Sequence, residues 1–121
     1  MISSEYRFHG RTALKFVYQN GQVVRGPFFS IKYALNPRQK SYRAAVVVSR
    51  KVNKSAVVRN RLRRRLYEAL RQNEQRISQP FDIVITVFSE NLDELEPAKL
   101  ERQLKDQLKS AKILGPKPPA L

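Results

Sequence analysis

The stretch from Asn53 to Arg71 constrains the fold most, because it is strongly basic and also regularly apolar. Between Arg50 and Arg65 it places eight Lys or Arg among sixteen residues, with no acidic residue among them. Asn53 or Ser55 can cap the start of a helix here. Read at about 100° per residue, its apolar side chains share one helical face. The segment therefore predicts an amphipathic helix of roughly 17 residues. The apolar stripe consists of Val58, Leu62, Leu66, Ala69 and Leu70.

The basic side chains of this helix predict a polyanionic partner. On a helical wheel, Arg59 and Arg63 flank one side of the apolar stripe. Arg61 and Arg65 flank the other side. Like charges four residues apart repel by a few tenths of a kcal/mol, so local helix stability does not explain them. The alternative is a merely solvated face. Because Glu68 is the only acid on the helix, we expect an anionic partner instead.

Composition and charge distribution limit which fold and which partners the rest of the chain can have. At 121 residues and 41% hydrophobic, the sequence predicts one folded domain over residues 1–114 and a flexible tail over residues 115–121. The net charge is +14. Residues 38–76 hold thirteen basic and two acidic side chains, whereas residues 77–121 hold six basic and seven acidic ones. A basic patch of this kind is typical of a nucleic-acid-binding surface.

The same composition argues against secretion and membranes. The chain has no cysteine, so it can form neither a disulfide framework nor a thiolate metal site. No apolar run approaches the roughly 18 residues of a membrane span. The N-terminus, MISSEYRFHGR, lacks the apolar core of a signal peptide. The basic helix could bind anionic lipid, but its small apolar face is needed for the protein's own core. We therefore expect a cytoplasmic protein with no membrane partner.

Periodicity and turn signals predict an α+β domain of order α-β-β-β-α-β-α, with helices packed on a four-stranded sheet. The strand over residues 42–49 contains the unbroken apolar run AAVVV, which predicts a central position in the sheet. The final helix is expected to stop at Gly115-Pro116. The expected elements are a helix over residues 13–19, strands over 22–25, 28–35 and 42–49, the basic helix, a strand over 81–88 and a helix over 97–113.

The second strand has two different faces. Its apolar set suits the core and consists of Phe29, Ile31, Tyr33 and Leu35. The other set offers an aromatic ring, a hydroxyl and a cation, which suit a nucleic-acid strand. That set consists of Phe28, Ser30, Lys32 and Ala34. For Phe28 alone, a packed edge residue is the alternative reading.

The chain offers no catalytic constellation of its own. His9 is the only histidine and has no cysteine or second histidine beside it. Ser49 and Ser55 lack a base partner, and Asp82 is expected to satisfy local backbone or pair with an arginine. No phosphate-binding glycine motif is present. If a reaction occurs, another molecule must supply its catalytic groups. We expect no metal ion at the exposed acidic loop formed by Glu90, Asp93, Glu94 and Glu96.

The segment from Lys51 to Arg64, KVNKSAVVRNRLRR, resembles the signature of the protein subunit of bacterial ribonuclease P. The centre of the resemblance is Arg59-Asn60-Arg61 followed by Arg63-Arg64. It extends over nearly the whole domain, from Arg7-Phe8 to Phe81-Asp82. The resemblance implies a two-layer α/β sandwich with a left-handed β-α-β crossover around the basic helix. General rules for such crossovers predict the right-handed form.

The resemblance also implies a function. The chain would form a 1:1 complex with a catalytic RNA. That RNA removes the 5′ leader from precursor tRNA. The RNA would hold the Mg²⁺ ions, so the resemblance implies no catalytic and no metal-binding residue on the protein. The implied contacts to the catalytic RNA are Arg50, Lys51, Lys54, Arg59, Asn60, Arg61, Arg63 and Arg64. The implied leader-binding cleft is lined by Leu14, Tyr18, Phe28, Lys32 and Phe88.

Four of the cleft positions depart from the family pattern. Leu14 and Tyr18 stand where the family often has Phe. Lys32 stands where Tyr is frequent, and Phe88 replaces a commonly basic residue. These departures bear on individual leader contacts and less on the basic helix.

Three other functions are compatible with parts of the pattern. A ribosomal or general RNA-binding protein would have a similar basic patch. A DNA-binding protein could place residues 53–71 in a major groove, although a strand-like segment precedes the helix instead of a short helix and turn. A nuclease acting alone would need clustered carboxylates or histidines.

Overall fold

The computed structural model describes residues 11–115. His9, Arg7-Phe8 and most of the expected tail lie outside this range. The α+β class and the expected order of helices and strands are confirmed, with two short 3₁₀ helices, η2 and η3, added between them. The elements are α1 (Arg11–Asn20), β1 (Gln22–Arg25), β2 (Phe29–Leu35), β3 (Arg43–Val48), α2 (Ala56–Arg71), η2 (Glu74–Arg76), β4 (Phe81–Val87), η3 (Glu90–Glu94) and α3 (Pro97–Ser110).

The four strands form one sheet of order β1-β2-β4-β3. β1–β2 and β2–β4 are antiparallel, whereas β3 and β4 are parallel. The prediction that the AAVVV strand is central is therefore wrong, because β3 is an edge strand. Its run is apolar on both faces because each face of β3 is covered. Ala44, Val46 and Val48 belong to the main core, and Ala45 packs in a second cluster with Val17 and Val84.

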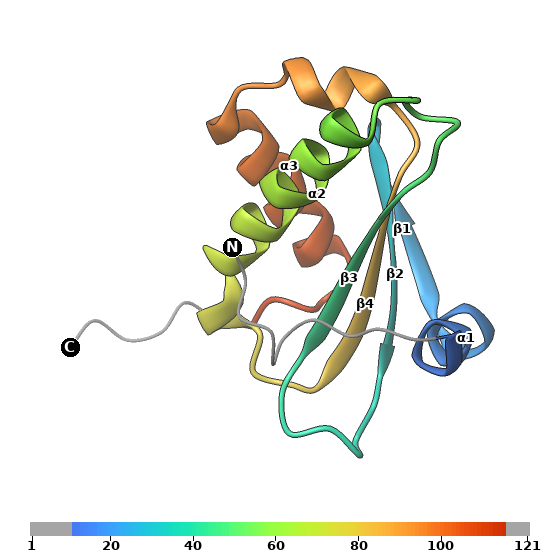
Figure 1. Cartoon of the computed structure of the whole chain (residues 1–121). Helices are drawn as coiled ribbons and strands as arrows, with labels where there is room; N and C mark the ends of the chain where they lie inside the picture. The colour runs from blue at the N-terminus through green and yellow to red at the C-terminus, as the bar shows by residue number, and fades with distance from the viewer. Residues whose placement is uncertain (1–10, 116–121) are drawn as a thin grey trace.

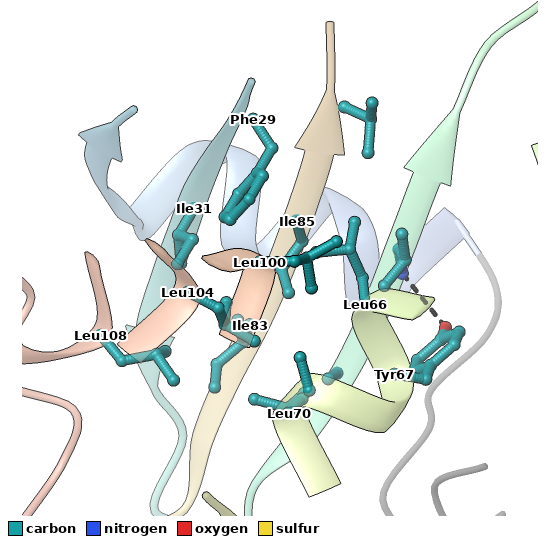
Figure 2. Packing of buried hydrophobic residues seen from close by; sticks show 14 of the residues in the cluster. Phe29, Ile31, Leu66, Tyr67, Leu70, Ile83, Ile85, Leu100, Leu104 and Leu108 are labelled. Atoms are coloured by element: carbon teal, nitrogen blue, oxygen red, sulfur yellow. Dashed lines mark hydrogen bonds between the residues drawn. The ribbon is translucent and has the colours of Figure 1, made fainter. Parts of the chain in front are cut away.

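Helices cover both faces of the sheet. In Figure 1, α2 and α3 lie on one side of the strands and α1 lies on the other. α2 connects the parallel strands β3 and β4. In Figure 2, seen from the side of α2 and α3 with both strands pointing up, β4 lies to the left of β3. This is the left-handed crossover that the resemblance implies.

The main core lies between the sheet and the helices α2 and α3 (Figure 2). The leucine stripe of α2 is buried there as predicted, with Val58 half-buried at its start. The stripe of α3 meets it from the neighbouring helix. Burial of such side chains stabilises a fold by about 1.5–3 kcal/mol each, which fixes the orientation of α2 and hence of its arginines. The buried leucines of the two helices are Leu62, Leu66, Leu70, Leu100, Leu104 and Leu108.

The faces of β2 are as expected over most of its length. Phe29 and Ile31 are fully buried and Tyr33 is half-buried, but Leu35 is 49% exposed. Leu35 pairs with Phe81 at the end of the sheet, where helix cover ends. Ala34, expected on the outer face, is buried.

α3 ends three residues earlier than expected, at Ser110. The reason is Lys112, whose backbone takes a left-handed conformation with φ of 60°. The amide of Lys112 donates to the carbonyl of Lys109, and that of Ile113 donates to the carbonyl of Leu108. These two bonds form a Schellman motif, which glycine usually closes. The chain therefore turns before Gly115.

Asp82 is buried at the beginning of β4 and pairs with an arginine, as expected. Its carboxylate accepts hydrogen bonds from Arg43 at 2.9 and 3.0 Å and from Asn36 at 2.9 Å. The pair ties β4 to the edge strand β3.

Candidate nucleic-acid interface

The loop before α2 is held by the helix it leads into. Ser55 is the N-cap, and its hydroxyl accepts from the amide of Val58. The side chain of Asn53 accepts from the amide of Ser55 at 2.9 Å. One guanidinium nitrogen of Arg59 donates to the carbonyls of Asn53 and Lys54, at 3.0 and 2.9 Å. These bonds fix the basic loop against the first turn of α2.

Two arginines of α2 face the segment that follows β4. Arg61 makes a bidentate ion pair with Asp93, with distances of 2.8 and 2.5 Å. Arg65 donates to the carbonyls of Leu92 and Asp93, both at 2.9 Å, and to that of Leu95. The hydrogen bond from Arg61 is the main cause that holds the pKa of Asp93 below its ordinary value. The carboxylate that pairs with Arg61 thus comes from about thirty residues away in the chain.

The opposite side of α2 carries cations without such partners. Arg63, which is half-buried, donates to the side chain of the exposed Asn60, three residues earlier on the helix. Arg64 is exposed, and within residues 11–115 its side chain has no hydrogen-bond or ion-pair partner. The same holds for the side chains of Arg50, Lys51 and Lys54 in the part of the chain that is described. Of the eight residues predicted to bind RNA, Arg61 is the one that pairs with a carboxylate within the part of the chain that the structure describes.

Three of the predicted cleft residues lie together on the α1 side of the sheet. The ammonium group of Lys32 donates to the backbone carbonyl of Tyr18 at 2.8 Å and lies 5.3 Å from the centre of its ring. Tyr18 is 46% exposed. Leu14 is half-buried against the cluster of Val17 and Val84. An exposed ring with a cation over it can stack a nucleobase and contact a phosphate.

Phe28 and Phe88 lie elsewhere. Phe28 packs against the main core, on the other side of the sheet from the Leu14 cluster. Phe88 is 39% exposed and follows β4, four residues beyond Val84, which pairs with Lys32. At about 3.3 Å per residue, Phe88 therefore lies about 13 Å along the strand from Lys32. The structure brings together part of the predicted cleft and separates the rest.

Two contacts of the predicted site residues, made by Arg25 and by Asp93, were not predicted from the sequence. The guanidinium of Arg25, at the end of β1, lies 4.6 Å from the centre of the Phe88 ring. In the sequence, Arg25 is marked only by its position next to Gly26-Pro27, which separates the two expected strands. The sequence indicates that Asp93 belongs to an acidic loop, but it does not indicate that Asp93 pairs with Arg61. Neither contact follows from local sequence, because each joins segments far apart in the chain.

Over residues 11–115, no group of three or more His, Cys, Asp or Glu side chains is arranged to hold a metal ion. None of the helices in this described part is both long enough and apolar enough to cross a membrane.

Comparison with known proteins places this chain in a family. The family model described as Ribonuclease P matches residues 2–112. The ribonuclease P protein component of Pseudanabaena sp. is 32% identical over 114 residues, which cover 94% of this chain and 97% of that protein. The RNase P protein of Thermotoga maritima has a similar structure, with a TM-score of 0.76, 25% identity and coverage of 86% of this chain and 96% of that one. For the RNase P protein of Staphylococcus aureus the TM-score is 0.80, at 23% identity, with coverage of 91% and 98%. The chain therefore belongs to the ribonuclease P protein family.

Proposed function

We propose that this chain is the protein subunit of a ribonucleoprotein ribonuclease P. It binds the catalytic RNA in a 1:1 complex and the 5′ leader of precursor tRNA, and so promotes endonucleolytic removal of the leader. Family membership supports the role in RNA processing. The observation that carries the assignment of the RNA-binding face is a group of basic side chains on α2 and in the loop before it. Within residues 11–115, Lys54, Arg63 and Arg64 have no carboxylate partner.

Binding to the catalytic RNA would be dominated by phosphate contacts. Arginine and lysine side chains neutralise phosphates, and each contact releases condensed counterions. Asn60 adds hydrogen bonds to sugar or phosphate oxygens. These contacts position the RNA without reading its sequence, which suits a subunit that must hold a folded RNA in one orientation.

The chemistry of hydrolysis would reside on the RNA subunit. Mg²⁺ held by that RNA would activate the attacking water and stabilise the leaving oxygen. The protein would act by binding and orienting the substrate. Tyr18 and Lys32, which contact each other, would stack a leader base and contact its phosphate, with Leu14 as an apolar support. Phe88 with Arg25 would serve a nucleotide farther along the leader.

Cleavage of precursor tRNA with a labelled 5′ leader tests the function. The reaction is run at low Mg²⁺ with protein alone, with a bacterial ribonuclease P RNA alone, and with both. We expect correct 5′ processing only when both are present. Tight RNA binding without stimulation of cleavage would instead support a general RNA-binding protein. Cleavage by the protein alone would place the catalytic groups on this chain.

A salt titration of RNA binding tests the assigned face. Arg64→Ala should flatten the slope of log affinity against log salt by about 0.7–0.9, the value of one lost phosphate contact. Arg102→Ala is the matched control, because Arg102 is an exposed arginine on α3. Equal slopes for the two variants would contradict the assignment of α2 as the RNA-binding face.

A further inference from the structure

The acidic segment, residues 89–96, lies along one side of α2. It contains η3 and carries four carboxylates within seven residues, at Glu90, Asp93, Glu94 and Glu96. Its contacts with the basic region run from the loop before the helix to the third turn. Asn53 donates to Glu90 at 3.3 Å, Arg61 pairs with Asp93, and Arg65 donates to three carbonyls of the segment.

These contacts separate the cations that face the acidic segment from other cations of α2 and of the loop before it. Asp93 neutralises Arg61, and three donors of Arg65 are committed to the carbonyls that end η3. Lys54 and Arg64 have no such partner in the described chain, and Arg63 has only the neutral Asn60. The division follows the helix sides, since Arg61 and Arg65 are four residues apart on the side that meets the acidic segment.

A phosphate that approached from the side of the acidic segment would meet a repulsive surface. The shallow hollow between this segment and the start of α2 is lined mainly by carboxylates and amides, together with Val58. To reach Arg61, a phosphate would have to displace Asp93, which already occupies two of its donors in fork geometry. A neutral pair releases few counterions, so it adds little to phosphate affinity.

We propose that the acidic segment is the boundary of the RNA-binding surface on α2 and that Asp93 sets the orientation of the bound RNA by withdrawing Arg61 from it. The RNA backbone then runs over Lys54, Arg63 and Arg64. This inference rests on the proposed function and refines it: it assigns a specificity role to a carboxylate, and it removes Arg61 from the phosphate contacts that the sequence predicts. Like-charge repulsion at an interface edge disfavours wrong binding modes more than it changes the right one.

The test measures binding of a bacterial ribonuclease P RNA at several salt concentrations to the full chain and its variants. Asp93→Asn frees Arg61 and removes a repelling charge, so it should steepen the salt slope by about 0.7–0.9. Its gain in affinity should be about three-fold larger at 50 mM than at 200 mM salt. Adding Arg61→Ala to Asp93→Asn should return the slope to the wild-type value. Asp106→Asn, an exposed carboxylate on α3, controls for net charge.

The outcomes separate this inference from the function it rests on. If Asp93→Asn weakened binding, Asp93 would position Arg61 for RNA. If the substitution left the salt slope unchanged, Asp93 would not affect Arg61 as an RNA contact. Either result would overturn the boundary role. An equal gain from Asp106→Asn would also overturn it. Arg64→Ala is measured in parallel. If Arg64→Ala leaves the slope unchanged, the RNA-binding face itself is wrong; if only Asp93→Asn fails, the face stands and the boundary does not. Urea unfolding of each variant confirms that it is folded.

Discussion

The phenolic oxygen of Tyr67 on α2 accepts a hydrogen bond from the backbone amide of Val46 on β3, at 3.1 Å (Figure 2). β3 is an edge strand, and edge amides can pair with strands of other molecules. Tyr67 satisfies this buried amide and is itself 8% exposed. The same contact ties the basic helix to the sheet, so it helps to hold the arginines of α2 in position.

Tyr67→Phe should lower the free energy of unfolding by about 1–3 kcal/mol, because it leaves the buried amide of Val46 without an acceptor while it keeps the ring. Urea unfolding measures the change. Tyr33→Phe is the control, since its hydroxyl donates to Gln22 in an exposed position and its loss should cost less than about 0.5 kcal/mol. If Tyr67→Phe lost as little stability as Tyr33→Phe, the amide of Val46 would have found another acceptor.

Leu66→Ala should lower the free energy of unfolding by about 2–5 kcal/mol, because Leu66 is fully buried between α2 and the sheet. Val57→Ala, on the same helix, should change it by less than about 0.5 kcal/mol, because Val57 is 67% exposed. Thermal or urea unfolding provides the comparison. A near-zero loss for Leu66→Ala would mean that α2 is not docked as described.

Lys112→Gly should raise the free energy of unfolding by about 1 kcal/mol, because Lys112 occupies the left-handed position that closes α3. The same substitution at Lys109, in the last turn of the helix, should lower it by about 1 kcal/mol. The opposite signs are the informative result. A loss of stability in both variants would indicate that the turn at Lys112 is not strained.

The ion pair of Asp93 predicts a dependence of stability on pH. Its pKa is lowered in the folded state, chiefly by the hydrogen bond from Arg61. Its contribution is therefore fully present above the ordinary pKa of 3.8 and is lost as the pH falls through the lower, folded-state value. The difference in unfolding midpoint between the wild type and Asp93→Asn should shrink below pH 3.8 and in high salt. A difference that stays constant through that range would contradict the pairing.

Much of the site could be read from residues close together in the chain. The four-residue spacing of Leu62, Leu66 and Leu70 predicts the buried face of α2, and the arginines then follow on the other faces. The capping chemistry of Ser55 gives its start. Contacts between distant segments could not be read in this way. The sequence groups Asp93 with exposed acids, although it lies against Arg61, and it does not predict the contact of Arg25 with Phe88.

By itself, the sequence determined the order of helices and strands and the basic, amphipathic character of α2, because periodicity and capping act over a few residues. Only the tertiary structure decided that β3 is an edge strand, since an apolar run records burial on two faces and not the number of neighbouring strands. It also decided which arginines keep a free charge. The charge of a guanidinium group is offset when a carboxylate comes within hydrogen-bonding distance. The packing of α2 beside the end of β4 brings the acidic segment to Arg61.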